Sequence, residues 1–325
     1  MNFSRREAVL GAASLAALLP ACAKSTGTVA SIQAGAKPLE IAGALPVVEL
    51  APIHLAVHNK YPGTVVKMGG VASLVAENPV DVAGNAETQV LRNYPKRRDI
   101  RIVMTLVEGN YSIVARRASG ISSLADLKGK KIGTFMASSA QYFISKMLKH
   151  AGLTDADAHI MNIPSLQDMP GALRRGELDA VGIWEPFSEN ALHELGADAI
   201  EFSGKGIYRE HYNVNTTAGA LADPVKRAQI VHFLRDLIDA TADMKRDPTM
   251  AQKLVAKSGG FTMEELARCW DRHTWLAGYA DDMLDVLTEE EAWLAPIEKR
   301  PALTRAELAP IIDRSAYLEA LALKR

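Results

Sequence analysis

Short apolar strands alternate with helical segments along the first two thirds of the chain, and this alternation is the feature that most restricts its fold. We expect strands at residues 39–42, 64–68, 80–83, 130–135, 159–163, 180–183 and 199–202, with two more between residues 100 and 117 around a turn at 108–110. Strands that alternate with helices are typical of sheets covered by helices. The sequence therefore predicts an α/β fold with mixed sheets.

The pattern changes after residue 223. Residues 223–279 are almost entirely helical by spacing, and residues 306–323 end the chain with an amphipathic helix. Asp223, Asp247 and Thr262 are expected N-caps, because their side chains precede the helical runs. We therefore expect a helical C-terminal segment.

The composition is that of an ordinary soluble globular protein. The chain has 325 residues, of which 48% are apolar and 23% charged, and its formal net charge is −1. Length suggests two domains or one two-lobed domain. A near-neutral chain without a basic stretch does not favour nucleic acid as a partner.

Residues 1–23 are typical of an export signal. Arg5 and Arg6 precede an apolar run over residues 8–19, which is too short to remain in a bilayer as a permanent helix. The paired arginines resemble a twin-arginine signal, and an ordinary secretion signal is the alternative.

The end of this segment has two interpretations. The stretch Leu19-Pro20-Ala21-Cys22 resembles a lipobox with Cys22 as the lipidated residue, whereas Ala21-Cys22-Ala23 also fits simple cleavage after residue 23. Either interpretation places the mature protein in the periplasm or on the outer face of the inner membrane. Contact with the membrane is then expected only through the lipid.

Cysteine and histidine give little sign of metal or redox chemistry. The two cysteines are Cys22 and Cys269, so no disulfide is expected once Cys22 is lipidated or removed. His54 and His58 are four residues apart on an expected helix, but no carboxylate-and-histidine signature accompanies them. We expect neither a metal nor a cofactor.

Three segments carry a family resemblance. They are GISSLADLKGKKIG, SSAQYFISKMLKHAGL and ALRRGELDAVGIWEPF, at residues 120–133, 138–153 and 172–187. In this order and spacing they resemble the solute-binding proteins of ABC importers for sulfonates, nitrate, taurine and thiamine pyrimidine precursors. The resemblance covers about residues 100–260, and residues 74–91 match the family more weakly.

The resemblance implies a two-lobed, type II periplasmic-binding-protein fold. Lobe 1 would contain residues 37–115 and 216–325 and lobe 2 residues 116–215, with chain crossings at residues 111–116 and about 212–219. A small solute would bind in the cleft, and the lobes would close on it by hinge motion. Residues 68–80 are shorter than the family's usual segment, so this wall of the cleft is the least defined.

Candidate binding residues follow from the resemblance and from chain position. Ser138 and Ser139 stand where a strand turns into a helix, and they would offer hydroxyl and N–H groups to a polar or anionic group. Plain N-capping is the alternative. Trp184 follows a strand and would cover the ligand or pack in the core.

The remaining candidates come from other strand ends and from the second crossing. Glu49 near the cleft would repel an anion or hold an amine. The full set is Val48, Glu49, Asn85, Ser138, Ser139, Gln141, Trp184, Tyr212 and Asn213.

Two functions remain open at this point. The first is a solute receptor that delivers a small polar or anionic solute, of sulfonate, nitrate or pyrimidine type, to ABC permease and ATPase subunits. The second is an enzyme on the same fold, of the pyrimidine-precursor or menaquinone-pathway type. The export signal favours the receptor, and it also occupies the place where a transcription regulator would carry its DNA-binding helices.

Overall fold

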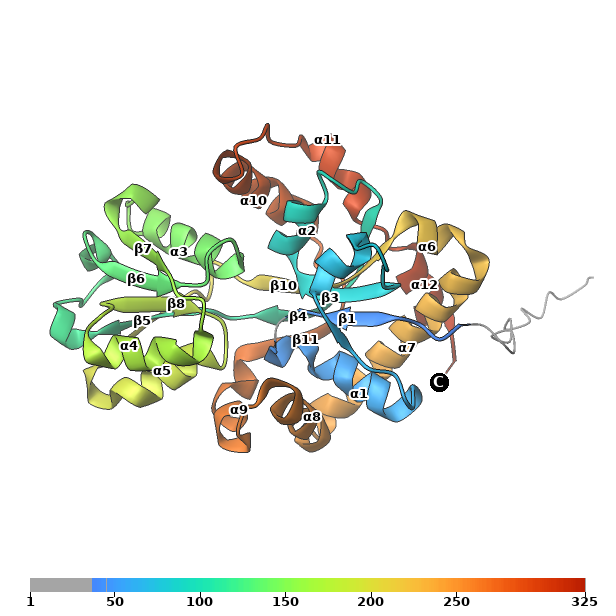
Figure 1. The fold of residues 1–325 in the computed structure, drawn as a ribbon, viewed down its shortest axis with the longest axis horizontal. Helices are drawn as coiled ribbons and strands as arrows, with labels where there is room; N and C mark the ends of the chain where they lie inside the picture. Colours follow the sequence, from blue (N-terminus) through green and yellow to red (C-terminus); the bar gives the residue numbers. More distant parts are fainter. Residues whose placement is uncertain (1–36, 45, 325) are drawn as a thin grey trace, which may run out of the picture. The chain divides into compact units, whose positions relative to one another are not determined.

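Two separate β-sheets organise the chain (Figure 1). The computed structural model describes residues 37–44 and 46–324. The expected export signal and Cys22 therefore lie outside the described residues. In the described part of the chain, no helix is long and apolar enough to cross a bilayer.

The first sheet has six strands in the order β11, β4, β10, β3, β1, β2. β1 pairs in parallel with β2 and β3, whereas β10 is antiparallel to β3 and β4, and β11 is antiparallel to β4. The strands are β1 Ile41–Gly43, β2 Lys67–Met68, β3 Val82–Ala86, β4 Ile100–Gly109, β10 Glu210–Thr217 and β11 His273–Gly278.

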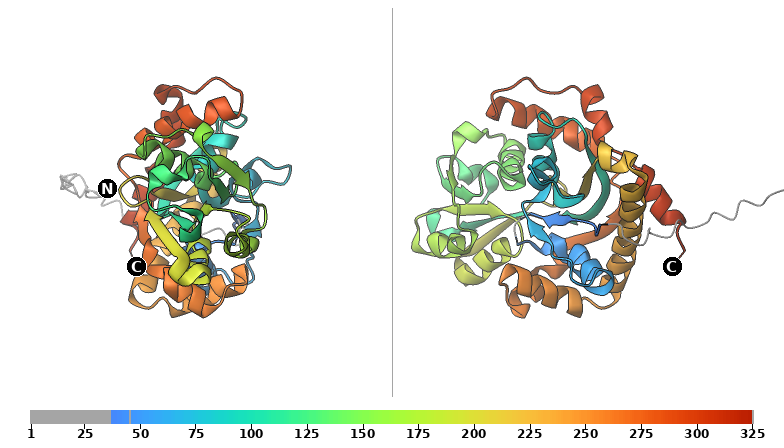
Figure 2. Two further views of the ribbon diagram at one scale, coloured as in Figure 1. Left: turned by 90° about the vertical axis from the view of Figure 1, so that its left-hand side faces the viewer. Right: turned by 45° about the vertical axis from the view of Figure 1, so that its right-hand side comes forward.

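Both faces of the first sheet are covered by helices. Successive strand residues point to opposite faces, so Ile41 packs in one core while Ala42 packs in another. The first core includes α1 (Ala51–Lys60) and α7 (Pro224–Arg246), and the second includes α2 (Glu87–Asn93) and α10 (Met283–Ile297). Figure 2 shows α7 beside the sheet, where it contacts both α1 and α12 (Ser315–Ala322).

The second sheet has five strands in the order β7, β6, β8, β5, β9. β6 is parallel to β7 and β8, and β5 is antiparallel to β8 and β9. Figure 1 shows α3 on one side of this sheet and α4 and α5 on the other. The elements are β5 Ser112–Arg116, β6 Lys131–Thr134, β7 His159–Asn162, β8 Ala180–Ile183, β9 Ala199–Ser203, α3 Ser139–His150, α4 Met169–Arg175 and α5 Phe187–Leu195.

These two mixed sheets with helical cover confirm the expected α/β fold class. The shorter helices are α6 Ala218–Ala222, α8 Thr249–Gly259, α9 Met263–Cys269 and α11 Arg305–Leu308. Asp223 and Thr262 cap α7 and α9 with their side chains, as expected, whereas α8 begins after Pro248.

Strand pairing leads us to propose other chain crossings than the expected segments. Ser112–Arg116 is not a crossing, because it pairs with β8 and β9 inside the second sheet. Glu210–Thr217 likewise belongs to the first sheet, through β3 and β4. We therefore place the crossings at residues 110–111 and 204–209, and we take the lobes to follow the two sheets.

The expectation of helix throughout residues 223–279 is wrong at its end. His273–Gly278 is a strand, β11, in which His273 and Trp275 are buried and Thr274 is exposed. This alternation suits a sheet edge, and β4 offers that edge to β11. Pairing with a distant strand therefore decides the local structure here.

Candidate functional site

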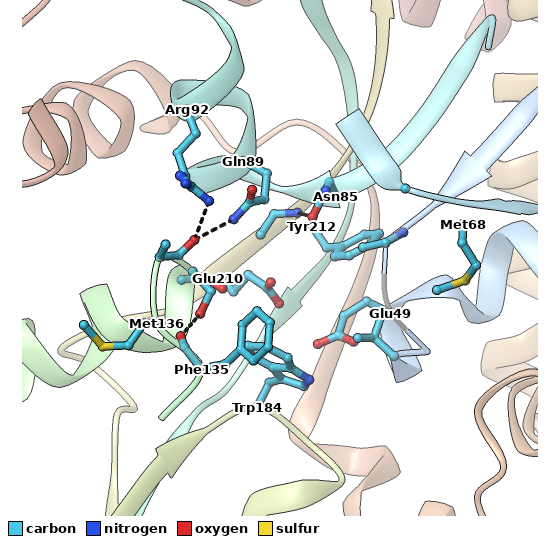
Figure 3. Close-up of a pocket in the computed structure, with 17 residues that line it drawn as sticks. Glu49, Met68, Asn85, Gln89, Arg92, Phe135, Met136, Trp184, Glu210 and Tyr212 are labelled. Atoms are coloured by element: carbon cyan, nitrogen blue, oxygen red, sulfur yellow. Dashed lines mark hydrogen bonds between the residues drawn. The ribbon is translucent and has the colours of Figure 1, made fainter. Parts of the chain in front are cut away.

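A cavity of about 390 Å³ is lined by residues of both lobes (Figure 3). The first wall is the part of the lining that the first lobe contributes. The second wall is the part that the second lobe contributes, namely residues 135–139 and Trp184. Six of the nine sequence-derived candidates line the cavity: Glu49, Asn85, Ser138, Ser139, Trp184 and Tyr212. Contact of these residues with a solute remains a prediction.

The second wall is built where β6 turns into α3. Ala137 has φ of 58°, a left-handed conformation that is uncommon for a residue with a side chain. Its N–H donates to Gln141 Oε1 at 2.8 Å, which holds this tight turn. Ser138 then has an extended backbone and caps α3.

The hydroxyl groups of both serines already have partners in the protein. Ser138 Oγ donates to the Phe135 carbonyl at 2.6 Å and accepts from the Ala140 N–H at 3.2 Å. Ser139 Oγ lies 2.9 Å from the Tyr111 hydroxyl oxygen. Capping therefore accounts for Ser138, whether or not a solute also reaches it.

The carbonyl of Ala137 joins the two walls. Gln89 Nε2 and Arg92 donate to this oxygen, each at 3.0 Å, from helix α2 of the first lobe. Two of the dashed lines in Figure 3 mark these bonds. Both side chains line the cavity, and sequence reasoning missed them because nothing in α2 marks which of its faces meets the second lobe.

Aromatic rings form part of the second wall. The Trp184 ring centroid lies 6.1 Å from that of Phe135 and 6.2 Å from that of Tyr111. Trp184 is 5% exposed, so it packs in the core and also lines the cavity. Its indole Nε1 has no hydrogen-bond partner among the described residues.

Glu49 lies on the first wall, in the short 3-10 turn Val48–Leu50 that leads into α1. Its carboxylate is buried, with Oε1 3.7 Å from His273 Nε2. Burial lowers the pKa of His273, but hydrogen bonding and charge from Glu49 outweigh this, and the pKa of the imidazole lies above its usual value. Glu49 and His273 therefore form a buried ion pair behind the cavity surface.

Glu210, at the start of β10, is a second buried carboxyl of the first wall and was missed from the sequence. Burial raises its pKa well above the usual range, and the nearby charges of Glu49 and Glu87 raise it further. Opposite Glu210 in the sheet is Gly109. A Cβ at that position would lie 2.8 Å from Glu210 Oε2 and 3.5 Å from Glu49 Oε1.

Asn85 and Tyr212 are neighbours on β3 and β10. Asn85 Oδ1 accepts from the Ala86 N–H at 2.9 Å, and the Tyr212 hydroxyl accepts from the Ala44 N–H at 3.3 Å. Both side chains thus face the cavity with one polar atom already paired.

The other three candidates do not line the cavity. Val48 is fully buried, and Gln141 holds the Ala137 turn with its side chain. Asn213 is fully buried within the sheet, where it accepts from Thr105 Oγ1 and donates to the His211 carbonyl. We therefore interpret Gln141 and Asn213 as residues that position the backbone of the walls.

No group of three or more metal-ligating side chains occurs in residues 37–44 and 46–324. His54 in α1 is half-buried, whereas His58 is exposed. Cys269 is a buried free cysteine whose thiol lies 3.6 Å from the Leu266 carbonyl oxygen.

Comparison with known proteins places this geometry in a family. The family model described as NMT1/THI5 like matches residues 66–251, which is more than half of the chain. The chain belongs to the NMT1/THI5-like family. The resemblance read from residues 120–187 is thereby confirmed at the level of the family.

Individual relatives of this NMT1/THI5-like chain carry several names. A Haemophilus influenzae protein named for thiamine biosynthesis is 29% identical over 184 residues, 55% of this chain and 56% of that protein. The match thus spans about half the length of this curated relative. The solved alkanesulfonate-binding protein SsuA from Xanthomonas axonopodis pv. citri, bound to MOPS, has a TM-score of 0.68 at 21% identity, over 86% of this chain and 100% of SsuA.

The same fold also occurs in an enzyme. The solved desulfurization enzyme DSZB has a TM-score of 0.57 at 14% identity, over 88% of this chain and 99% of that chain. At such identities the likeness concerns the fold alone, and function has to be argued from the site.

Proposed function

We propose that the chain is an extracytoplasmic solute receptor of an ABC import system, which binds a small polar organic solute between its lobes and delivers it to membrane permease and ATPase subunits. The observation that carries this proposal is the cavity of about 390 Å³ with lining residues from both lobes. A solute that touches both walls favours the closed arrangement of the lobes, and a permease can recognise that arrangement.

The contacts around the cavity support this proposal. The Ala137 carbonyl is held by Gln89 and Arg92 across the lobes, and Trp293 Nε1 donates to Ser145 Oγ at 3.0 Å from α10 to α3. Together with the ion pairs of Arg272 to the second lobe, these polar contacts join two lobes that have their own sheets. Such an interface can open and close with modest changes in free energy.

The test is a search for ligands of the purified mature protein by thermal shift over sulfonates, nitrate, aromatic acids, amines and pyrimidines. A ligand at a hundred times its Kd should raise the free energy of unfolding by about 2.7 kcal/mol. Small-angle scattering should then show that the best ligand reduces the radius of gyration. An unchanged radius with a saturating ligand would contradict lobe closure.

One observation favours an enzyme as the second candidate. A carboxyl with a raised pKa in a cavity is what a general acid requires, and Glu210 is such a group. Mass spectrometry of each bound compound after prolonged incubation separates the candidates. A receptor returns the compound intact, and turnover would favour the enzyme.

We also propose export, with the mature protein in the periplasm or on the outer face of the inner membrane. The paired arginines and the apolar run over residues 8–19 support it. Fusion of residues 1–30 to a reporter that is active only outside the cytoplasm tests it. Cys22→Ala should release a lipidated protein from membranes and leave a cleaved one unchanged.

A further inference from the structure

Three buried polar atoms of the cavity lining have no partner within the described part of the chain. They are Glu49 Oε2, Glu210 Oε2 and Trp184 Nε1. Their side chains are 1%, 4% and 5% exposed, so water at the molecular surface does not reach them. Each unpaired buried polar atom costs about 1–3 kcal/mol. A solute that supplies the missing partners recovers this free energy.

Two of these atoms accept hydrogen bonds and belong to carboxyl groups. The nearest cations do not neutralise both of them. Arg92 pairs with Glu298 at 2.9 Å and also donates to the Ala137 carbonyl. His273 faces Glu49, and no ion pair joins Glu210 to a cation in residues 37–44 and 46–324. Glu49 Oε2 and Glu210 Oε2 are therefore left without a cation in contact, although the raised pKa of Glu210 favours its neutral form.

Several donor groups of the second wall already have partners. The hydroxyls at the α3 N-terminus are paired within the protein, and the Ala137 N–H is taken by Gln141. An anionic solute would meet the carboxyl groups of Glu49 and Glu210 on the first wall. Like charges at close range are unfavourable, and more so in a buried site than in water.

We propose that the solute carries a flat cationic nitrogen head, of amidinium or arylammonium type, that donates N–H bonds to Glu49 and Glu210. This inference rests on the receptor function proposed above. The rings of Phe135 and Trp184 give such a head an aromatic surface, because a cation is attracted to the face of an aromatic ring. The Trp184 indole N–H then donates a hydrogen bond to an acceptor elsewhere on the solute.

Gly109 provides the space that the two carboxyls share. A Cβ there would press on Glu210 Oε2 at 2.8 Å, which forces the carboxyl to move. The phenol of Tyr111 also borders this space, 3.5 Å from the same Cβ position. Gly109→Ala therefore displaces the proposed head-binding group and leaves its carboxyl group in place.

We expect binding of a cation to be coupled to release of a proton. The groups that act on Glu210 are Glu49 from the turn before α1, Glu87 from α2 and Tyr111 from the crossing, with His273 behind Glu49. Burial and the two carboxylates raise the pKa of Glu210 and so favour its protonated, neutral form in the empty site. A bound cation favours the carboxylate, so binding releases about one proton and affinity rises with pH.

Three probes with the same ring test the sign of the charge: benzamidinium, benzoate and benzenesulfonate. Isothermal titration of the full-length mature protein should show millimolar or tighter binding of benzamidinium and weaker or no binding of the anions. Titration in two buffers of different ionisation enthalpy should show release of about one proton. Glu210→Gln should weaken benzamidinium binding at least tenfold and abolish the proton release, whereas Gly109→Ala should weaken binding and keep the release.

Glu291→Gln is the matched control, because Glu291 of α10 is a buried carboxylate that forms an ion pair with Arg300. It should leave the probe's Kd unchanged. Preference for benzoate or benzenesulfonate would overturn the cationic head and leave the receptor proposal standing. Failure of benzamidinium to bind at millimolar concentration would also overturn it, whereas chemical conversion of a bound probe would instead contradict the receptor function.

Discussion

On the second wall of the cavity the hydroxyls of Ser138 and Ser139 each have a partner inside the protein, whereas on the first wall Glu49 and Glu210 each keep one unpaired oxygen in the described structure. The serine hydroxyls of the second wall thus have partners without a solute, whereas the Trp184 indole N–H has none among the described residues. The first wall carries the cost of buried, unpaired carboxyl oxygens. This difference supports the proposal that the first wall selects the solute by charge, while the second gives it an aromatic surface and a fixed shape.

The largest expected effect is on the packing of the second wall. Trp184→Ala should lower the free energy of unfolding by about 3–5 kcal/mol, because a buried aromatic side chain is replaced by a cavity. Trp184→Phe should retain most of this stability, since the ring still meets Phe135 and Tyr111. Urea denaturation measures both variants, and a loss below about 1 kcal/mol for the alanine variant would mean that the indole does not support this wall.

The next effect concerns Glu87, which lies in α2 behind the first wall. Unlike Glu210, it accepts from the Tyr208 hydroxyl at 3.0 Å and from the His211 N–H at 2.9 Å. Burial nevertheless raises the pKa of Glu87 to about 7, although these hydrogen bonds lower it. A buried carboxyl with donors therefore still holds its proton more tightly than the same group does in the unfolded chain.

The sign of the pH dependence follows from this shift. Between about pH 4.5 and about pH 7 the folded state binds a proton at Glu87 that the unfolded chain has lost, so stability falls as the pH rises through this window. The loss is on the order of 3 kcal/mol for a shift of this size. Thermal unfolding at about pH 5 and about pH 8 should show the decrease, and Glu87→Gln should flatten it. A rise in melting temperature with pH would contradict the burial of a protonated carboxyl.

The sequence predicts the second wall better than the first. The strand-to-helix turn at Ser138 and the strand before Trp184 are local features, since hydroxyl caps and apolar runs can be read within a few residues. Glu210 could not be predicted in this way. It reaches the cavity because β10 pairs with β4, a strand about 100 residues earlier in the chain.

The same physical reason accounts for the other residues that were missed. Gln89 and Arg92 lie within an ordinary helix, and only the approach of the second lobe gives them the Ala137 carbonyl as a partner. The spacing around His273 predicts a helix, but the structure places this residue in β11, which pairs with β4. Contacts between segments far apart in the chain thus determine the charged side of the cavity, whereas its capped and aromatic side follows from local sequence.

A smaller effect is expected where ion pairs join the lobes beside the cavity. Arg272, in the turn between α9 and β11, pairs with Glu185, Glu189 and Glu201 of the second lobe. Arg272→Met leaves these three carboxylates without their shared cation, and we expect a loss of about 2 kcal/mol because Arg272 is partly exposed. Arg305→Met removes a pair that is largely in water, with Asp285, and should cost less than about 0.5 kcal/mol.

Chemical denaturation compares the two arginine variants. Equal losses would mean that the Arg272 cluster contributes no more than a surface pair. Scattering of the Arg272→Met protein without ligand should also show a larger radius of gyration, because one of the contacts that hold the walls together is gone.

The smallest effect tests the second wall at Ser138. Its hydroxyl caps α3 and donates to the Phe135 carbonyl, so Ser138→Ala should lower the free energy of unfolding by about 1 kcal/mol. Ser123→Ala is the matched control, because Ser123 forms a capping box with Asp126 away from the cavity lining and should cost a similar amount. Denaturation gives the stabilities, and calorimetry gives the Kd of benzamidinium for each variant.

If the second wall acts only through shape, both serine variants keep the Kd of the unchanged protein within about twofold, since neither removes an unpaired group. A helix N-terminus that binds the solute behaves differently. Ser138→Ala would then lose at least tenfold in affinity, about 1.4 kcal/mol, while Ser123→Ala would not. That outcome would add the α3 N-terminus to the Trp184 indole as a polar contact of the second wall, so that this wall would bind the solute through its backbone as well as shape its surroundings.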